Sequence, residues 1–116
     1  MEGIATNSGQ YELSVNLPNT EGIIEGLPRD LVVECPAIVD KKGLHGVKLE
    51  GAPKGILGLW RNQASVQDLV VEAVLTQSKE IALQALLVDP VVQNAESAEK
   101  TLDEILHLQK DYIHLT

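Results

Sequence analysis

The chain has 116 residues, of which 44% are hydrophobic, and its formal net charge is −8. This length fits one domain with a modest core. The excess of acidic residues excludes the basic stripe that binds nucleic-acid phosphates. No apolar run approaches the roughly 18 residues that a membrane span needs. We therefore expect neither nucleic acid nor a membrane as a partner.

The cysteine content and the N-terminus indicate the cellular compartment. Cys35 is the only cysteine, so the chain forms no internal disulfide, which fits a reducing cytoplasm. Residues 1–10 are polar and contain glycine, without the basic and apolar stretches of a signal peptide. We expect a cytoplasmic protein with a flexible segment over 1–10 and a folded part over 11–116.

The first half of the chain predicts short antiparallel strands. Residues 11–17 alternate apolar and polar side chains, which is typical of a strand with one face in water. Residues 31–39 are apolar and β-branched, as in a buried strand, and Pro36 predicts an edge or a bend because it cannot donate to a ladder. The sequence Asp-Lys-Lys-Gly at 40–43 predicts a hairpin turn, with the returning strand over 44–50.

The second half changes to the helical period. Pro53 predicts the start of a helix that runs to about Arg61. Ser65 and Asp68 resemble a capping box, which predicts a separate second helix. That helix, Ser65–Gln77, is apolar at positions 66, 69, 70, 71, 73, 74 and 75, more than the single stripe that a surface helix needs.

Two more helices complete the predicted layout. Ser78 is the expected cap of one, and Asp89-Pro90 ends it because a residue before proline avoids helical angles. The last helix begins near 94–97, and its apolar face consists of Ala98, Leu102, Ile105, Leu106 and Ile113. Short antiparallel strands followed by three to four helices make an α+β fold.

Three motifs in a fixed order carry a family resemblance. The first is Asn-Leu-Pro-Asn at 16–19 with the glycine and the Leu-Pro-Arg-Asp turn that follow it. The second is Val-Glu-Cys-Pro-Ala at 33–37, and the third joins 67–73 to 82–90. Over about residues 11–114, this set resembles the C-terminal region of the NAD- and metal-dependent glycosidases of glycoside hydrolase family 4.

The resemblance implies a longer parent enzyme. Its N-terminal Rossmann domain would hold NAD, and a divalent metal, usually manganese, would bind a Cys and a His near the substrate. Such enzymes oxidise the sugar at C3, remove the C2 proton, eliminate the leaving group, add water and reduce the ketone again, an exception to the two-carboxylate pattern. The present chain would be the end of the substrate-side domain, built like the C-terminal domains of lactate dehydrogenase-like proteins.

The resemblance also implies what this chain lacks. The family's metal-binding Cys and His and its base lie upstream, so no residue here inherits a catalytic, NAD-binding or metal-binding role. The chain would instead help to wall the active site and form subunit contacts. The helix start at 95–103 favours the α-glucosidase and α-galacturonidase branch over the phospho-β-glucosidases.

The cluster Trp60-Arg61-Asn62-Gln63 is the strongest candidate for a contact. It is predicted to lie between two helices, and its donors suit a sugar or an acidic group. The resemblance places this connection on the side that faces the rest of the enzyme. We expect a substrate or subunit contact at Trp60, Arg61 and Asn62, with Asn16 as a further candidate; the alternative is a core tryptophan beside a surface cation.

Two further groups have a chemical and a structural interpretation. Cys35 is either a metal ligand or redox thiol, or a small buried hydrophobe, which is the commoner case. His107 with Asp103 or Asp111 has helical spacing for a metal, but zinc and manganese sites need a third ligand, so a solvated helix face is favoured.

The region around the hairpin offers carboxylates and glycines. Glu34 and Asp40 have even spacing and are either an acid–base pair or surface residues, and surface placement is favoured. His45 is expected to be exposed. The glycines Gly43, Gly46 and Gly51 lack the pattern of a phosphate loop and are expected in tight turns.

Together these features favour a C-terminal fragment of a family-4 glycosidase that is inactive alone and binds neither NAD nor manganese. Its expected partners are the rest of the parent enzyme and further copies in a homo-oligomer, because the helix Ser65–Gln77 needs a second apolar layer. The alternative is a free-standing acidic protein-interaction module without catalytic activity.

Overall fold

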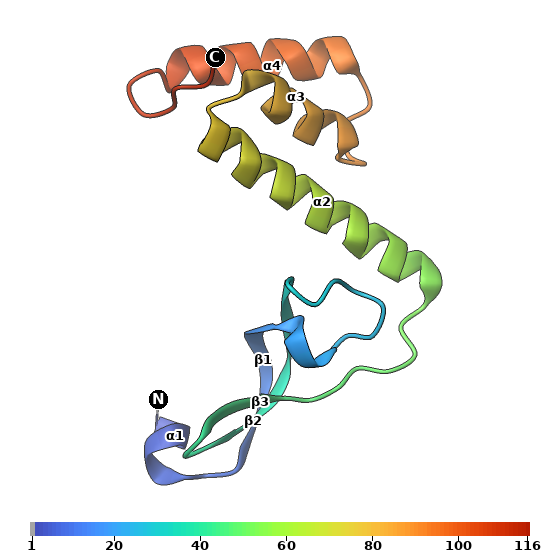
Figure 1. Cartoon of the computed structure of the whole chain (residues 1–116), viewed down its shortest axis with the longest axis vertical. Coiled ribbons are helices and arrows are strands. Elements are labelled where there is room, and N and C mark those ends of the chain that lie inside the picture. Colours follow the sequence, from blue (N-terminus) through green and yellow to red (C-terminus); the bar gives the residue numbers. More distant parts are fainter. Residues whose placement is uncertain (1) are drawn as a thin grey trace. The chain divides into compact units, whose positions relative to one another are not determined.

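The computed structural model describes residues 2–116, which divide into two units, one up to Gly58 and the other Leu59–Thr116. The first unit contains a three-stranded antiparallel sheet, and the second contains helices (Figure 1). The α+β fold is therefore confirmed. Within the described part of the chain, no helix has the length and apolar character needed to cross a membrane.

The sheet has the strand order β1-β2-β3, with β1 at Gln10–Pro18, β2 at Val32–Asp40 and β3 at Gly43–Gly46. Asp40 pairs with Gly43, which leaves a two-residue hairpin loop and confirms the predicted turn. Gly43 has a φ of 123°, a backbone conformation that favours glycine.

A β-bulge in β1 changes the predicted alternation. Glu12 pairs with Ala37 and Val15 pairs with Cys35, so β1 has one extra residue between these two pairs. The extra residue reverses the faces on its N-terminal side. Val15 and Leu17 therefore lie on the inner face as expected, whereas Tyr11 and Leu13 are exposed, Leu13 by 81%.

Pro36 lies opposite this bulge. It directly precedes Ala37, which forms the last β2–β3 pair with Gly46. Its carbonyl accepts from the Val47 amide at 2.8 Å, but it has no amide to return. The ladder therefore ends there, so β3 is shorter than the predicted strand over 44–50. Leu49 instead donates to the Ile23 carbonyl at 2.7 Å.

A loop between β1 and β2 folds around the buried side chain of Asn19, which is the first residue of the short 3-10 helix η1 (Asn19–Glu21). Its Nδ2 donates to the carbonyls of Ile24 at 3.1 Å, Leu27 at 3.3 Å and Pro28 at 3.0 Å. Its Oδ1 accepts from the Ile24 amide at 2.9 Å. One side chain thus satisfies backbone groups across ten residues of loop.

The loop and the inner face of the sheet form the core of the first unit. Its buried members are Ile23, Ile24, Leu27, Val33 and Cys35, with Val15, Leu17, Leu31 and Leu57 packed against them. The fit is close at Gly46, where an added Cβ would lie 2.6 Å from Ile23 Cδ1.

The N-terminal segment contains a helix that was not predicted. α1 covers Glu2–Thr6 and packs against the end of β2, where a Cβ added at Gly3 would lie 3.0 Å from Val39 Cγ1. The expected flexibility of residues 1–10 in solution stays a prediction.

One long helix replaces the two that were predicted over 53–77. α2 covers Lys54–Thr76 without a break, because residues 61–65 contain neither glycine nor proline. The proposed capping box at Ser65 is wrong: Ser65 Oγ donates back to the Arg61 carbonyl at 3.1 Å, a bond made inside a continuous helix. Pro53 lies just before the helix and accepts its first bond, from the Leu57 amide at 3.0 Å.

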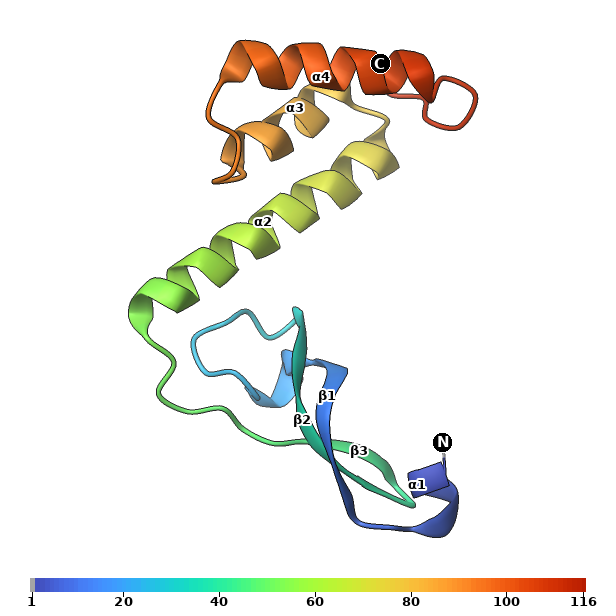
Figure 2. The same ribbon diagram turned by 180° about the vertical axis from the view of Figure 1, so that it is seen from behind.

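The remaining helices begin where they were predicted, one at its expected cap Ser78 and the other within residues 94–97. α3 (Lys79–Val88) is capped by Ser78, whose Oγ accepts from the Ile81 amide at 3.2 Å, and α4 (Ala95–Leu108) by Asn94, whose Oδ1 accepts from Ser97 at 2.8 Å. The two helices lie side by side in both views (Figures 1 and 2). Ile113 was expected within the last helix, but it lies beyond its end, after the turn at 109–112.

We predict that Asn19→Ala lowers the free energy of unfolding by about 3 kcal/mol, because it leaves a buried amide and several carbonyls without a partner. The matched control is Asn16→Ala, an exposed asparagine of the same motif, which should cost less than about 0.5 kcal/mol. Urea unfolding of both variants measures the difference. Equal losses would show that Asn19 does not hold the loop.

Candidate functional site

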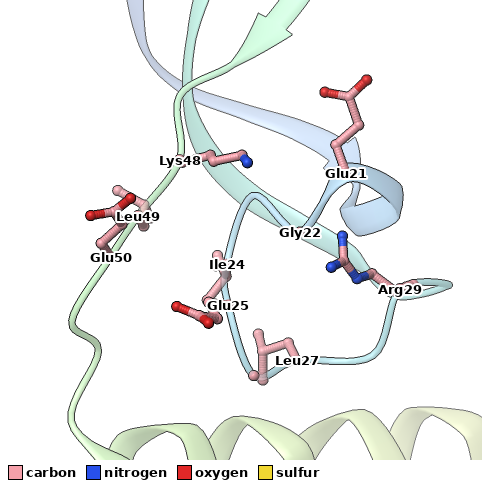
Figure 3. Close-up of a pocket in the computed structure, with 10 residues that line it drawn as sticks. Glu21, Gly22, Ile24, Glu25, Leu27, Arg29, Lys48, Leu49 and Glu50 are labelled. Carbon is pink, nitrogen blue, oxygen red and sulfur yellow. The ribbon is translucent and has the colours of Figure 1, made fainter.

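The first unit contains a small hollow of about 240 Å³ between the loop and the segment after β3, here called the loop hollow (Figure 3). It is lined by Glu21, Gly22, Ile24, Glu25, Gly26, Leu27, Arg29, Lys48, Leu49 and Glu50. The Leu49–Ile23 hydrogen bond and the bridge between Ile24 and Leu49 hold its two sides together. Backbone contacts between the loop and the segment after β3 therefore set its shape.

The rim of the loop hollow is charged with both signs. Arg29 Nη1 donates to the Thr20 carbonyl at 3.1 Å, and its guanidinium covers Gly22 so closely that an added Cβ would lie 2.5 Å from Nη1. Gly22 also has a φ of 68°, so both the lack of space for a Cβ and the backbone conformation favour glycine at this position. In Figure 3 the Lys48 side chain extends over the loop, whereas Glu21 points away from it. Such a rim offers donors and acceptors to a polar molecule.

Trp60, Arg61 and Asn62 do not lie between two helices, as the sequence predicted, but inside α2. Trp60 is partly exposed, so the alternative of a core tryptophan is wrong. Asn62 Nδ2 donates to the Val88 carbonyl at 3.1 Å and so ties α2 to the end of α3. Their contact with a substrate or a subunit stays a prediction.

Asn16, the fourth candidate, lies on the outer face of the sheet opposite Glu34, and both side chains are exposed. Asn16 belongs to the first unit, whereas Trp60, Arg61 and Asn62 belong to the second. The structure therefore does not unite the four predicted contact residues within one unit.

Glu34 and Asp40 lie on one face of β2. Because they are six residues apart along the strand, their Cα atoms are about 20 Å apart, which is too far for an acid–base pair. Asp40 Oδ1 accepts from His45 Nε2 at 2.9 Å and from the Lys42 amide at 2.7 Å. These bonds, that of His45 first, hold the pKa of Asp40 below its usual range. His45 is exposed as predicted, and the pair braces the hairpin.

The metal site considered around His107 does not form. Asp103 pairs with Lys79 and raises the pKa of that lysine, while Asp111 lies beyond the end of α4 and so lacks helical spacing from His107. Among the described residues, no three His, Cys, Asp or Glu side chains come together as metal ligands.

Cys35 is buried in the apolar core of the first unit, with 2% of its surface exposed. Burial raises the pKa of its thiol, because the charged thiolate is disfavoured there. The structure thus places Cys35 as a small hydrophobe.

Sequence reasoning missed a second hollow, which lies wholly in the second unit between α2, α3 and α4. This apolar groove has a volume of about 340 Å³ and is lined by Val66, Val70, Ala73, Val74, Ala82, Ala85, Leu86, Asp89, Leu102, Ile105, Leu106, Ile113 and Leu115. The excess of apolar positions on 65–77 was its signal in the sequence. The loop hollow was also missed, although the motif at 16–19 with the glycine that follows it pointed to that loop.

Comparison with known proteins gives a consistent family. Residues 1–92 match the family model described as the family 4 glycosyl hydrolase C-terminal domain. The chain is 41% identical over 114 residues to an alpha-glucosidase of Erwinia rhapontici, which covers 98% of this chain and 25% of that protein. It is 33% identical over 112 residues to the 6-phospho-beta-glucosidase BglT of Thermotoga maritima, covering 97% of this chain and 26% of the relative.

Solved structures agree with the sequence relatives. A 6-phospho-alpha-glucosidase from gut microorganisms, in complex with NAD and Mn²⁺, superposes with a TM-score of 0.88 at 28% identity, over 99% of this chain and 26% of that one. The Thermotoga maritima 6-phospho-beta-glucosidase, with manganese, NAD⁺ and glucose-6-phosphate, gives 0.86 at 33% identity, over 97% and 27%. The chain thus spans about a quarter of the length of the relatives it matches.

We predict that Cys35 reacts with an aromatic disulfide reagent at pH 8 at least about a hundredfold more slowly in the folded chain than in urea, because burial both shields the thiol and raises its pKa. Absorbance of the released thiolate measures the rate. Val91→Cys, at a position 77% exposed, is the control and should react at once. Fast reaction of Cys35 in the folded chain would restore the redox interpretation.

Proposed function

Because the chain belongs to glycoside hydrolase family 4 as the C-terminal domain of its members, we propose that it works as the last part of a longer NAD- and manganese-dependent glycosidase. The complete enzyme would hydrolyse O-glycosyl bonds by oxidation and elimination. The catalytic, dinucleotide and metal groups would belong to the remainder of that enzyme. This chain would help to wall the substrate site and form subunit contacts.

One observation carries the proposal: nearly the whole chain superposes on about a quarter of a 6-phospho-alpha-glucosidase that is bound to NAD and Mn²⁺. The side chains described here do not fit the metal, since they offer no cluster of three ligands in residues 2–116. No chemical step is therefore assigned to them. Instead they would contribute surfaces to the enzyme: the lining of the loop hollow and the exposed side of α2.

The alpha-glucosidase match supports a proposal for the anomer of the substrate. Identity is 41% to the alpha-glucosidase and 33% to the 6-phospho-beta-glucosidase, over similar lengths. The match to the alpha-glucosidase supports the preference for α-linked substrates that the helix start at 95–103 suggested; identity by itself does not separate the two anomers, since the chain is 30% identical to a phospho-alpha-glucosidase. We therefore include an α-glycoside substrate in the proposal.

A chimera tests the proposal. The 114-residue stretch of the Erwinia rhapontici alpha-glucosidase that this chain matches is replaced by the chain itself. We expect the chimera to hydrolyse a nitrophenyl α-glucoside with NAD and manganese at no less than about a tenth of the parent rate, since the same fold restores the missing wall. The control is the parent without this stretch, which should be inactive.

Measurements on the isolated chain complete the test. Calorimetry should detect no micromolar binding of NAD or manganese, and no nitrophenyl glycoside should be cleaved. A soluble chimera of parental size that is no more active than the truncated control would contradict the proposal. It would favour the alternative of a free-standing interaction module.

We also predict that the chain alone self-associates through one side of α2. Val71 and Leu75 lie one helical turn apart, are exposed by 58% and 79%, and do not line the apolar groove. Because the net charge of −8 opposes association, higher salt should strengthen it. Sedimentation across a salt series should show a dimer or larger species.

Variants identify the surface that associates. Val71→Asp and Leu75→Asp should each weaken association by about tenfold or more, since they place a charge in an apolar contact. Val91→Asp, at an exposed valine outside α2, is the matched control and should change little. A strict monomer at high protein concentration and high salt would refute self-association.

A further inference from the structure

The apolar groove is lined by large side chains that the second unit leaves open to solvent. Val70 is 50% exposed, Val74 is 62% exposed and Ile105 is 46% exposed, although all three line the groove. The buried residues of the unit are mostly alanines, which bring the helices together without filling the space between their larger neighbours. The second unit therefore leaves the apolar side chains that line the groove partly uncovered.

The helical geometry of α2 supports the same view. At 3.6 residues per turn, the apolar positions from Leu69 through Val70 and Val74 to Leu75 cover an arc of about 240°. A helix on the surface of a globular protein needs an apolar arc of roughly 100°. α3 and α4 use one side of this arc, so a further layer must cover the part at the groove mouth.

We propose that the groove receives the apolar face of a helix from the preceding part of the longer protein, and that it is the seat on which that part docks. This inference rests on the proposed function. Its first support is length: about three quarters of each relative lies outside the stretch that this chain matches. A covering helix would thus be available in the same polypeptide.

The shape of the groove favours a helix as its occupant. Val66, Val70 and Val74 recur at every fourth position along α2, and Leu102 with Leu106 repeats this spacing on α4. Such rows form the ridges between which the side chains of a further helix pack. An amphipathic helix that presents apolar residues at positions i, i+4 and i+7 fits this seat.

Charge distinguishes this occupant from a second copy of the chain. Residues 59–116 contain nine carboxylates and four lysine or arginine side chains, a net charge of −5. This charge opposes a second copy in the groove, as it also opposes the self-association predicted at Val71 and Leu75, whereas a neutral or basic helix meets no such repulsion. Asp89 is the one charged residue in the lining. A lysine or arginine beside the apolar face of the incoming helix would meet it.

The active chimera allows a direct test, because its groove should be filled whereas that of the chain alone is open. Val70→Asp and Val74→Asp should lower the unfolding temperature of the chimera by at least about 5 °C each, since they bury an unpaired carboxylate. In the chain alone the same variants place a carboxylate on a half-exposed site, and we expect shifts of less than about 2 °C. Val91→Asp should have a small effect in both proteins.

Each outcome has a separate meaning. A chimera with the unaltered chain that lacks activity refutes the proposed function. An active chimera that tolerates Val70→Asp and Val74→Asp as well as Val91→Asp overturns the docking seat and leaves the proposed function standing. If these two variants convert a dimeric chimera into monomers of unchanged unfolding temperature, the groove belongs to a second copy, which also overturns the inference.

Discussion

The first unit depends on the hydrogen bonds of Asn19. Backbone groups of a loop that lie outside regular strands and helices must find other partners, and one buried amide makes four such hydrogen bonds, to Ile24, Leu27 and Pro28. With its polar groups satisfied, the loop can direct Ile23, Ile24 and Leu27 onto the sheet. The same folded loop forms one side of the loop hollow, so core and hollow have a common origin.

Features with local causes could be predicted from the sequence. The cap Ser78, the start of the last helix near Asn94 and the hairpin after Asp40 each depend on a few neighbouring residues. The bulge of β1 and the short β3 depend on which strand lies opposite, because the extra residue and Pro36 matter only through their partners. The prediction wrongly split α2 into two helices for a different reason. A serine such as Ser65 can cap a helix or donate to a carbonyl inside one, and the neighbouring residues are compatible with either role.

The candidate sites divide in the same way. The burial of Cys35 could be predicted because residues 31–39 are mostly apolar, and the exposure of His45 because it lies between two glycines beside a hairpin turn. Trp60, Arg61 and Asn62 were expected on a connection, and the continuity of α2 places them on a helix instead. Neither hollow was found from the sequence, since each joins segments far apart in the chain: the loop hollow joins 21–29 to 48–50, and the apolar groove joins three helices.

The two hollows differ in chemistry, and this difference bears on what each can hold. The loop hollow has cations and carboxylates at its rim, which remain well solvated when the hollow is open, so water can fill it without cost to the fold. The apolar groove has a nearly uniform aliphatic lining, and leaving it in water sacrifices hydrophobic stabilisation. The first hollow is thus stable when empty, whereas the second favours a permanent occupant. A chain that spans a quarter of its relatives is expected to expose such a surface where the rest of the protein would pack.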